Sequence, residues 1–587
     1  MNYAAPVADI RFALEACAGL WRVRETGAFP DLDESLLEAI LDGVGALSAD
    51  VLAPLNACGD REGVRLSNGR VFAPEGFAAA YAQFVDAGWQ GMTADPAHGG
   101  QGMPRAVALA AHETMHSANM AFGLAPMLTL GAIEALEAHG TDAQKAMYLP
   151  KLATGAWSGA MNLTEPQAGS DVGALQTRAT PVGDGSFKIT GQKIFITWGD
   201  HDLADNIIHL VLARLPDAPA GSKGVSLFIV PKFLPTPAGE VGQANAVRCL
   251  GVERKMGIHG SPTCTMGYEG ATGWLVGGEN EGLAMMFTMM NAARINVALQ
   301  GVAVAEAAYQ KTISYAHERF QGRGEGAATK GASPIAMHAD VRRMLLTMRA
   351  LVQAGRAICY AAGVEADMGV HGIDDEARRA ARARADLLVP IAKAWCTDRG
   401  VEVASLGVQV HGGMGFVEDG GAAQFYRDAR IAPIYEGTNG IQAIDLIGRK
   451  VAGDGGAAMR ALIADAREVA HAARDSGRPR LLRIGVRLNA AAETMEEATR
   501  WLLKVSEHAR RDALAGADTY LRLAGDLTGA FLTTRGLLNA DAEAVEAQET
   551  PALFFAETIL ALAPSRLAAL TLGADVLFEA DLGDEAR

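Results

Sequence analysis

Patterns typical of β-strands occur in one stretch of this sequence, about residues 157–275, and patterns typical of helices fill the chain on both sides of it. Asp184-Gly185 is a strong signal for a two-residue hairpin turn inside that stretch,. The segments rich in β-branched and aromatic residues are 186–190, 193–197, 207–213 and 225–230,. Because helices and strands are segregated along the chain, the order predicts an α+β, mostly helical fold with a central antiparallel β-domain, and it excludes an alternating βαβ fold.

Helical periodicity is clear in three places. Apolar residues recur three and four apart over residues 36–55, where Asp33 can cap the start of a helix,. A second helix is expected from Pro104 through Ala121, because proline suits the first turn,. Residues 321–334 are expected to form a loop and residues 453–456 a hinge. The last helical block carries an amphipathic stripe that must pack against another element, formed by Leu488, Ala491, Met495, Ala498, Leu502 and Val505,.

The composition narrows the class of protein. The chain has 587 residues, 49% of them apolar, enough for several packed cores, and its net charge of −16 argues against nucleic acids and anionic membranes as main partners,. No apolar run reaches the roughly 18 residues of a membrane span. Asp9, Arg11 and Glu15 interrupt the N-terminal stretch where a signal peptide needs apolar residues,. Six scattered cysteines without a CxxC pair are typical of reduced thiols, so we expect a cytoplasmic protein,.

His112-Glu-Thr-Met-His116 matches the HExxH pattern. On a helix, this spacing places two imidazoles on one face for zinc, with Glu113 as a general base. No glycine and third histidine follow at the metzincin spacing, although Glu134 and Glu137 are available as a distant ligand. A zinc hydrolase is therefore the alternative of a different class, and a chance match is the simpler explanation.

Glu436 is the candidate catalytic base. It lies between Ile434-Tyr435 and a glycine, and Pro433 ends any helix just before it. A carboxylate on a loop among apolar neighbours should have a raised pKa, which suits proton abstraction. The alternative interpretation is a negative charge that stabilises the N-terminus of a helix beginning near Thr438. These residues alone leave both interpretations open.

Four motifs occur in one order and spacing: Leu163-Thr-Glu-Pro-Gln-Ala-Gly-Ser-Asp171, Lys193-Ile-Phe-Ile-Thr197, Gln409-Val-His-Gly-Gly413 and Tyr435-Glu-Gly-Thr438. Over about residues 45–450 the chain thereby resembles the acyl-CoA dehydrogenase family. The resemblance implies a helical N-terminal domain, an antiparallel β-domain and a C-terminal four-helix bundle around one FAD, which this family binds without a Rossmann fold. The HExxH segment falls in the family's N-terminal domain, which binds no metal.

The resemblance, with the chain's two additional ends, gives five parts. They are an N-terminal extension (1–40), the N-terminal helical domain (41–156), the β-domain (157–280), the helical bundle that carries the base (281–450) and an extra C-terminal helical domain (451–587).

The reaction that the resemblance implies is α,β-dehydrogenation of a short- or medium-chain acyl-CoA thioester to the 2-enoyl-CoA. Glu436 matches the family's catalytic base, which removes the α-proton while the β-hydrogen passes as hydride to flavin N5. The base's own backbone N–H and a ribityl hydroxyl of FAD would donate hydrogen bonds to the thioester carbonyl, because the enolate-like charge needs stabilisation.

The resemblance assigns cofactor contacts residue by residue. Thr164 and Thr197 match positions at the flavin ring edge, and Arg319 matches an arginine whose planar fork suits the FAD pyrophosphate. Gln409 matches a position at the adenine end, which this family contributes across a subunit interface. The full set of expected FAD contacts is Leu163, Thr164, Ser170, Phe195, Ile196, Thr197, Arg319, Gln409, Gly412, Gly413 and Thr438.

Substrate contacts are expected from four residues. Ser170 matches a position near the thioester arm of CoA, and Arg294 matches an arginine near the pantetheine, although a salt bridge within the helices explains Arg294 almost equally well. The expected set is Ser170, Arg294, Tyr435 and Gly437.

Three positions depart from the family pattern. Phe195 stands where many members have Trp, and Gly440 replaces a residue that makes a second FAD hydrogen bond. Ala293 occupies the position where the isovaleryl and some long-chain branches place their base. Glu436 is therefore the single candidate base.

The segments Ile196-Thr-Trp-Gly-Asp-His-Asp202 and His259-Gly-Ser-Pro-Thr-Cys264, with the long C-terminal extension, resemble one bacterial branch of the family. That branch oxidises 3-(methylthio)propanoyl-CoA to 3-(methylthio)acryloyl-CoA in dimethylsulfoniopropionate catabolism. It implies an electron-transferring flavoprotein as electron acceptor and a homodimer, because the extra block can cover the surface that smaller members use to form tetramers. A fatty acyl-CoA dehydrogenase of β-oxidation and an acyl-CoA oxidase are alternatives that the motifs do not separate.

Overall fold

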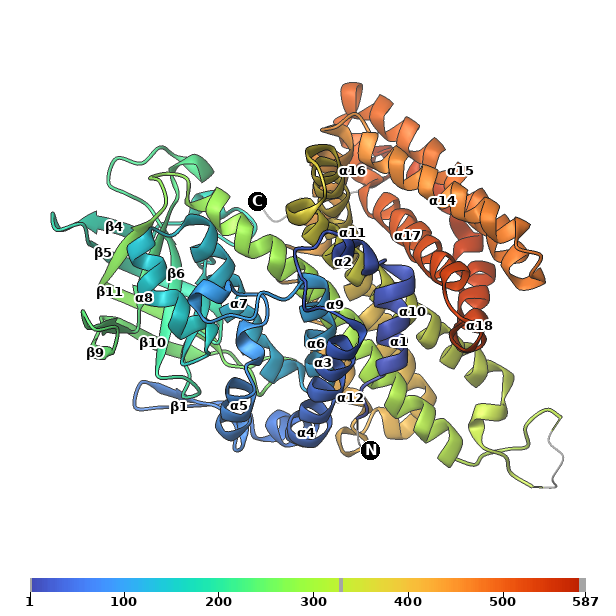
Figure 1. Ribbon diagram of the computed structural model, residues 1–587, viewed down its shortest axis with the longest axis horizontal. Helices are drawn as coiled ribbons and strands as arrows, with labels where there is room; N and C mark the ends of the chain where they lie inside the picture. The colour runs from blue at the N-terminus through green and yellow to red at the C-terminus, as the bar shows by residue number, and fades with distance from the viewer. Residues whose placement is uncertain (1–2, 327–330, 580–587) are drawn as a thin grey trace.

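The computed structural model describes residues 3–326 and 331–579, without the side chain of residue 292, so part of the predicted loop 321–334 lies outside the described residues. It confirms the α+β, mostly helical fold. Figure 1 shows the strands gathered on one side of the molecule and long helices filling the rest.

The N-terminal part consists of helices with one short hairpin. Asp33 caps α3 as predicted, its side chain accepting from Leu36 N–H. The expected helix 104–121 is shorter than predicted: it ends at Ala118, because Asn119 takes an extended backbone and caps the next helix. The elements are α1 (Val7–Arg11), α2 (Trp21–Glu25), α3 (Glu34–Leu47), α4 (Ala53–Glu62), β1 (Arg65–Ser67), β2 (Arg70–Phe72), α5 (Phe77–Asp86), α6 (Arg105–Ala118), α7 (Met120–His139) and α8 (Asp142–Ala153).

Helix α7 joins this part to the β-domain. It lies against β3 (Trp157–Asn162), where Gly159 donates its N–H to Thr129 Oγ1 at 3.0 Å and leaves no room for a side chain beside Ala132. By length and composition, two helical stretches are apolar enough to cross a membrane, Met120–His139 and Ala542–Leu570. The first is 94% buried inside the protein, as a core helix must be,.

The β-domain is built on one bent sheet in the order β3-β6-β7-β11-β5-β4, with β10 paired to β11, and β8 and β9 form a separate two-stranded sheet. The long strand β11 bends the sheet, because its last residues pair with β7 and the rest pairs with β5. The predicted hairpin joins β4 to β5, and all pairs are antiparallel except β3 with β6, which is parallel. The remaining bounds are β4 (Arg178–Pro181), β5 (Phe187–Thr197), β6 (Asn206–Ala213), β7 (Ser226–Pro231), β8 (Phe233–Pro235), β9 (Val241–Ala244), β10 (Val247–Val252) and β11 (Thr263–Val276).

Three long helices form the bundle after the β-domain: α9 (Gly282–Glu318), α10 (Ala339–His371) and α11 (Asp375–His411). Two short helices, α12 (Ala422–Ala429) and α13 (Asn439–Asp445), pack on α11 and bracket the loop that contains Glu436.

The C-terminal block is helical and packs on the bundle through α17. Gly525 leaves room for the Trp395 ring, and Trp395 Nε1 donates to Asp526 Oδ1 at 2.8 Å. The predicted stripe on α15 is buried from Leu488 to Leu502. The elements are α14 (Ala457–Asp475), α15 (Pro479–His508), α16 (Arg510–Ala515), α17 (Ala517–Asn539), α18 (Ala542–Thr558), α19 (Ala563–Leu570) and α20 (Asp575–Glu579).

Candidate functional site

Glu436 lies in the loop between α12 and α13 with a left-handed backbone, φ 56°. This conformation costs a non-glycine residue on the order of 1–3 kcal/mol, so the surrounding contacts must hold it there. Gly437 follows with φ 88°, and the Thr438 side chain accepts from Ile441 N–H as the cap of α13. The helix start is therefore capped by Thr438, which leaves the Glu436 carboxylate without that structural role.

Burial raises the pKa of Glu436 to about 7, although Arg294 and Lys393 each act to lower it. The raised pKa agrees with the expectation from its apolar neighbours. A carboxyl with this pKa is deprotonated in about half of the molecules at neutral pH and accepts a proton readily.

The loop is held through its carbonyl groups. Arg294 Nε donates to Glu436 O at 3.4 Å, Gln442 Nε2 donates to the same oxygen at 3.3 Å, and Lys393 Nζ donates to Gly437 O at 2.7 Å. Within the described part of the chain, the Glu436 N–H has no acceptor. One backbone donor next to the base is therefore available to a bound molecule.

Tyr435 closes one side of the loop. Its hydroxyl donates to Gln300 Oε1, and Gln300 Nε2 reaches Met127 Sδ at 3.3 Å. This contact joins the loop to α9 and α7, and neither Gln300 nor Met127 stood out in the sequence.

The two β-domain motifs meet at one edge of the sheet. Ile194 N–H donates to Thr164 O at 2.9 Å, which places the loop after β3 beside the end of β5. Phe195 has φ 59° at an irregularity of the β5–β11 ladder, and its side chain is 59% exposed. Neither the Thr164 nor the Thr197 hydroxyl has a hydrogen-bond partner within the described residues. Leu163 and Ile196 lie in the same two segments, and Ser170 is exposed further along the loop.

Glu165 and Lys193 anchor this loop. Lys193 Nζ donates to Glu165 Oε1 at 2.8 Å and to Leu163 O at 2.9 Å, and both side chains are buried. Burial acts to raise the pKa of Glu165, but Lys193 and Thr177 lower it to about 2. This pair was not predicted from the sequence, in which the two segments are separate motifs.

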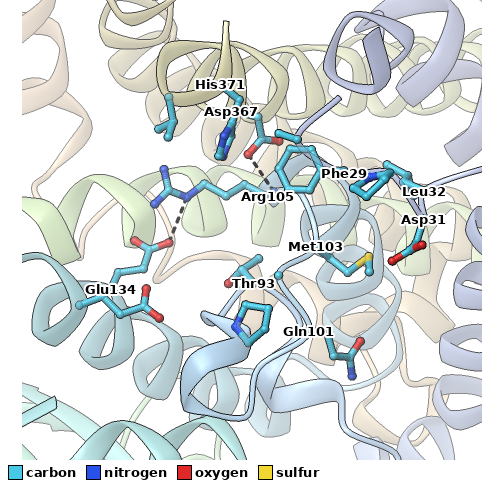
Figure 2. A pocket seen from close by; sticks show the side chains of 16 residues that line it. Phe29, Asp31, Leu32, Thr93, Gln101, Met103, Arg105, Glu134, Asp367 and His371 are labelled. Atoms are coloured by element: carbon cyan, nitrogen blue, oxygen red, sulfur yellow. Dashed lines mark hydrogen bonds and ion pairs between the residues drawn. The ribbon is translucent and has the colours of Figure 1, made fainter. Parts of the chain in front are cut away.

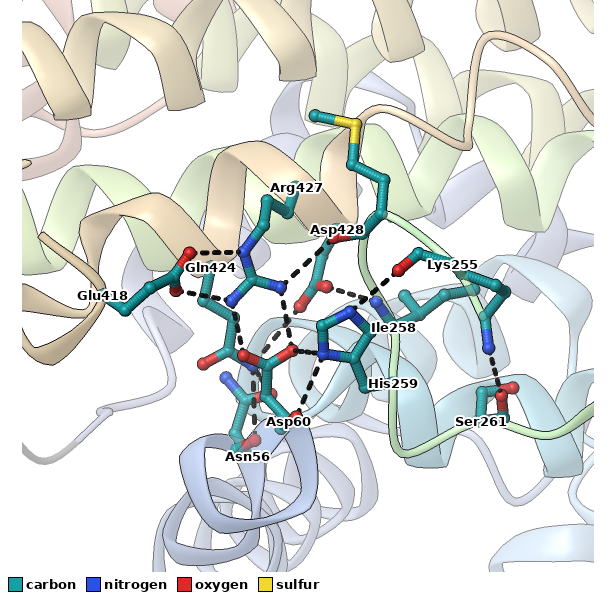
Figure 3. A network of polar contacts seen from close by, with 11 residues as sticks. Asn56, Asp60, Lys255, Ile258, His259, Ser261, Glu418, Gln424, Arg427 and Asp428 are labelled. Atoms are coloured by element: carbon teal, nitrogen blue, oxygen red, sulfur yellow. Dashed lines mark hydrogen bonds and ion pairs between the residues drawn. The ribbon is translucent and has the colours of Figure 1, made fainter. Parts of the chain in front are cut away.

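A polar network ties α12 to the β-domain and to α4 (Figure 3). Ile258 N–H, in the turn before β11, donates to Asp428 Oδ1 at 2.5 Å, and Arg427 binds Asp60 Oδ1 at 2.9 Å. His259 bridges Asp60 O and Lys255 O, both at 3.0 Å. Because Asp428 is eight residues before Glu436, this network fixes the base relative to the β-domain.

The remaining predicted cofactor residues gather elsewhere. Arg319 follows the last turn of α9, and Gln409, Gly412 and Gly413 lie at the end of α11. The ends of these two helices meet, since Tyr315 stacks on His411 with ring centroids 4.3 Å apart. Along α9, Arg319 is roughly 35 Å from Arg294 at 1.5 Å per residue. One chain therefore does not bring this second cluster to Glu436.

The HExxH residues are used inside the protein core. Glu113 accepts from Arg356 Nε at 2.7 Å and from the Tyr360 hydroxyl at 2.5 Å, and His112 Nδ1 lies 2.9 Å from Asn296 Oδ1. Burial lowers the pKa of His116 to about 3. Glu113 is thus part of an ion network and not an exposed general base, and the described residues contain no group of three or more side chains suited to a metal.

A cavity of about 440 Å³ lies where residues 28–32 cross the N-terminus of α6 (Figure 2). Asp367 accepts from the N–H groups of Arg105 and Ala106, both at 3.0 Å, and Arg105 pairs with Glu134 at 3.3 Å. None of the residues predicted to contact FAD or the acyl-CoA lines this cavity, although Glu134 and Glu137, considered above as distant zinc ligands, do. Two of its charged groups, Arg105 and Glu134, are thus paired with each other, and Asp367 stabilises the start of α6.

Profiles of known families match almost the whole chain. "Acyl-CoA dehydrogenase, N-terminal domain" matches residues 37–156, the family's middle domain matches 160–271 and its C-terminal domain matches 280–452. A fourth profile, "Acetyl-CoA dehydrogenase C-terminal like", matches residues 457–581.

Individual relatives agree with these profiles. The chain is 48% identical to 3-methylmercaptopropionyl-CoA dehydrogenase of Ruegeria pomeroyi over 99% of this chain and 100% of the relative. It is 36% identical to a butyryl-CoA dehydrogenase of Syntrophomonas wolfei over 76% of each protein. Among solved structures, an acyl-CoA dehydrogenase of Bacillus anthracis complexed with FAD superposes with a TM-score of 0.74 at 21% identity, over 98% of this chain and 93% of that one.

Proposed function

The chain belongs to the acyl-CoA dehydrogenase family, and we propose that it oxidises 3-(methylthio)propanoyl-CoA to 3-(methylthio)acryloyl-CoA with Glu436 as the catalytic base. The class of activity, oxidation of the CH–CH bond of an acyl-CoA, follows from the family. The observation that carries the proposed base is the strained loop, which holds a carboxyl of pKa about 7 beside an unused backbone N–H. The support for the methylthio substrate is the identity to the Ruegeria enzyme over the full length of both proteins.

FAD is the cofactor of this family, and the residues present fit it. Near the exposed Phe195, the hydroxyls of Thr164 and Thr197 have no hydrogen-bond partner among the described residues, as donors to the flavin edge would require. Arg319 and Gln409 are exposed, and Gly412 and Gly413 have open space where a Cβ would stand. When bound, FAD supplies the acceptor for the hydride. We propose that Leu163, Ile196 and Ser170 line the same cofactor and that Thr438 lies beside it.

The residues of the loop would have separate roles in the reaction. Glu436 removes the α-proton at a carboxylate oxygen, and its backbone N–H donates to the thioester oxygen, where negative charge develops. Gly437 lets the chain turn directly after the base, and Tyr435, held by Gln300, closes the loop on the acyl side. Arg294 donates to the Glu436 carbonyl and lies 3.9 Å from Asp445, a contact of the salt-bridge kind that was the alternative interpretation of this arginine. Its contact with the pantetheine stays a proposal.

We propose a homodimer in which each cofactor site uses two chains. The second cluster, with Arg319 and Gln409, lies too far from Glu436 to serve the same flavin within one chain. Next to that cluster, Met414, Phe416 and Val417 are exposed by 48%, 88% and 45%, and exposed apolar groups of this kind are typical of an interface,. A single chain therefore presents an incomplete site.

The proposed setting is a cytoplasmic enzyme that passes electrons to an electron-transferring flavoprotein. The charge of −16 opposes binding to anionic membranes,. The five-part division proposed for the chain assigns residues 281–450 to catalysis and residues 451–587 to packing against the bundle.

Kinetics with a series of thioesters tests the substrate. We expect kcat/KM for 3-(methylthio)propanoyl-CoA to exceed that for butanoyl-CoA and octanoyl-CoA, with an electron-transferring flavoprotein as acceptor. A higher value for butanoyl-CoA or octanoyl-CoA would retain the family and reject the methylthio substrate. Rapid reoxidation of the reduced flavin by oxygen would instead indicate an oxidase.

The pH dependence tests the base. Since Glu436 acts only when deprotonated and burial raises its pKa in the free enzyme to about 7, we expect kcat/KM to rise about tenfold per pH unit below pH 7 and to level off above it,. A pH profile of kcat/KM between pH 5.5 and 9 checks this. A profile that is already flat at pH 5.5 would show that no base with a pKa near 7 is needed, and it would contradict this role of Glu436.

A further inference from the structure

Lys393 lies directly behind the catalytic loop, although none of the motifs includes it. It is on α11, and its side chain is fully buried. Its Nζ donates to Gly437 O at 2.7 Å and to Asn439 Oδ1 at 3.0 Å, so both bonds reach residues that directly follow the base.

This lysine has no ion-pair partner within 4 Å in the described part of the chain, whereas Lys193, the other fully buried lysine of the site, is paired with Glu165. A buried ammonium without a carboxylate is costly unless its charge serves another group. Burial lowers the pKa of Lys393 to about 7, and the largest opposing influence is Glu436, followed by Asp398. The base is thus the anionic group that interacts most strongly with Lys393.

Two other charged groups near the base, Arg294 and Asp398, have contacts of their own. Arg294, on α9, faces Asp445 of α13 at 3.9 Å. Asp445 also pairs with Arg449. Asp398 accepts from Asn439 Nδ2 at 2.7 Å and interacts with Arg522 and Asp518 of α17. Arg294 and Lys393 are therefore the two cations that act on Glu436, and Lys393 is the one without a carboxylate within 4 Å in the described part of the chain.

Asn439 extends the contact into the helix. Its Nδ2 donates to Ala394 O at 3.1 Å and to Thr397 Oγ1 at 3.0 Å, while its Oδ1 accepts from Lys393. Because Asn439 is the first residue of α13, this network fixes the loop from its C-terminal side. Arg294 and Gln442 hold the preceding carbonyl, so two consecutive carbonyls are fixed and the left-handed turn at Glu436 is retained.

We propose that Lys393 is a positioning residue of the dehydrogenation: it fixes the Gly437 carbonyl, and its positive charge stabilises the carboxylate form of Glu436. The inference rests on the proposed role of Glu436. It assigns to Lys393 no contact with substrate or FAD.

Three variants of the FAD-loaded enzyme test it. Lys393→Met removes the charge and the hydrogen bonds, Lys393→Gln removes the charge and keeps a donor, and Thr397→Val removes a neutral hydroxyl from the same network. Without the positive charge, the Glu436 carboxylate is less stable. We therefore expect the acidic limb of the kcat/KM profile to move up by about 1 pH unit in both Lys393 variants and to stay in place in Thr397→Val. At pH 7 kcat/KM should fall about fivefold, because the deprotonated fraction of Glu436 falls from about one half to about one tenth, while KM changes by less than threefold.

A second readout does not depend on turnover. Infrared difference spectra, with Glu436→Gln as reference, isolate the carboxyl stretch of Glu436. This band should titrate about 1 pH unit higher in Lys393→Gln than in the wild type. The proposal would be overturned if both Lys393 variants showed the wild-type pH profile and the wild-type infrared titration of Glu436. Loss of the fold or of FAD in both variants would assign Lys393 to structure alone and also overturn it. Failure of the wild-type enzyme to oxidise any acyl-CoA would instead contradict the proposed function.

Discussion

Glu436→Gln is expected to lower kcat by about 10⁴-fold at pH 8 while the protein keeps its bound flavin, because the amide has nearly the shape of the carboxyl but cannot accept the α-proton. The loop should persist, since Arg294, Gln442 and Lys393 hold its carbonyls and not the carboxylate. Single-turnover flavin reduction by the thioester measures the rate, and the visible spectrum measures the flavin. Retention of a tenth or more of the wild-type rate would show that another group removes the proton.

The same variant should be more stable than wild type at alkaline pH. The folded-state pKa of Glu436 is about 7, above its ordinary value of 4.5, so this carboxyl makes unfolding easier as pH rises through that interval,. At pH 8 the cost is on the order of 2 to 3 kcal/mol, and at pH 4.5 it is nearly absent. The melting temperature of Glu436→Gln should be higher than that of the wild type at pH 8 and equal to it near pH 4.5. Glu497→Gln, at an exposed position of α15, is the control. Its melting temperature should equal that of the wild type at both pH values.

Arg356→Met is expected to have the largest effect on stability. Arg356 is buried between Glu113 and Glu306, at 2.5 and 2.9 Å, and the methionine would leave two buried carboxylates without a cation. Breaking a buried ion pair in this way costs about 3–5 kcal/mol. We expect either little soluble protein or a melting temperature lower by several degrees, measured by thermal unfolding with FAD bound.

The same helix offers a matched control for this variant. Arg343, also on α10, pairs with Asp340 in solvent at 2.9 Å, and Arg343→Met should cost less than about 1 kcal/mol,. Equal melting temperatures for the two variants would contradict the assigned role of the buried network. Adding Glu113→Gln to Arg356→Met should recover part of the loss, because one of the two uncompensated carboxylates is removed.

The sequence predicted the fold class because its signals were local. The change from helical to alternating periodicity near residue 157 located the sheet, Asp33 marked the start of α3, and Asp184-Gly185 marked the β4–β5 turn. The expected helix through Ala121 was wrong at its end. Asn119 can occur within a helix or cap one, and only the packing at Leu52, which accepts from its side chain, decides between them.

The candidate site was only partly predictable. Glu436 was found because its neighbours are apolar and the segment lacks helical spacing. Lys393 and Gln300 are separated from it by 43 and 136 residues and occupy ordinary helical positions, so no local pattern distinguishes them. The pairing of Glu165 with Lys193 likewise depends on a strand register that periodicity does not fix,. That Arg319 lies away from Glu436 follows from the length of α9, and Gln409 lies beside it because the ends of α9 and α11 meet.

The anaerobic visible spectrum of the purified enzyme, before and after one equivalent of 3-(methylthio)propanoyl-CoA per flavin, tests the central claim most directly. The account predicts a yellow protein whose flavin band bleaches within the mixing time of a manual assay, and a Glu436→Gln variant that stays yellow. A flavin band that no acyl-CoA bleaches, or a protein that remains colourless after incubation with FAD, would contradict it.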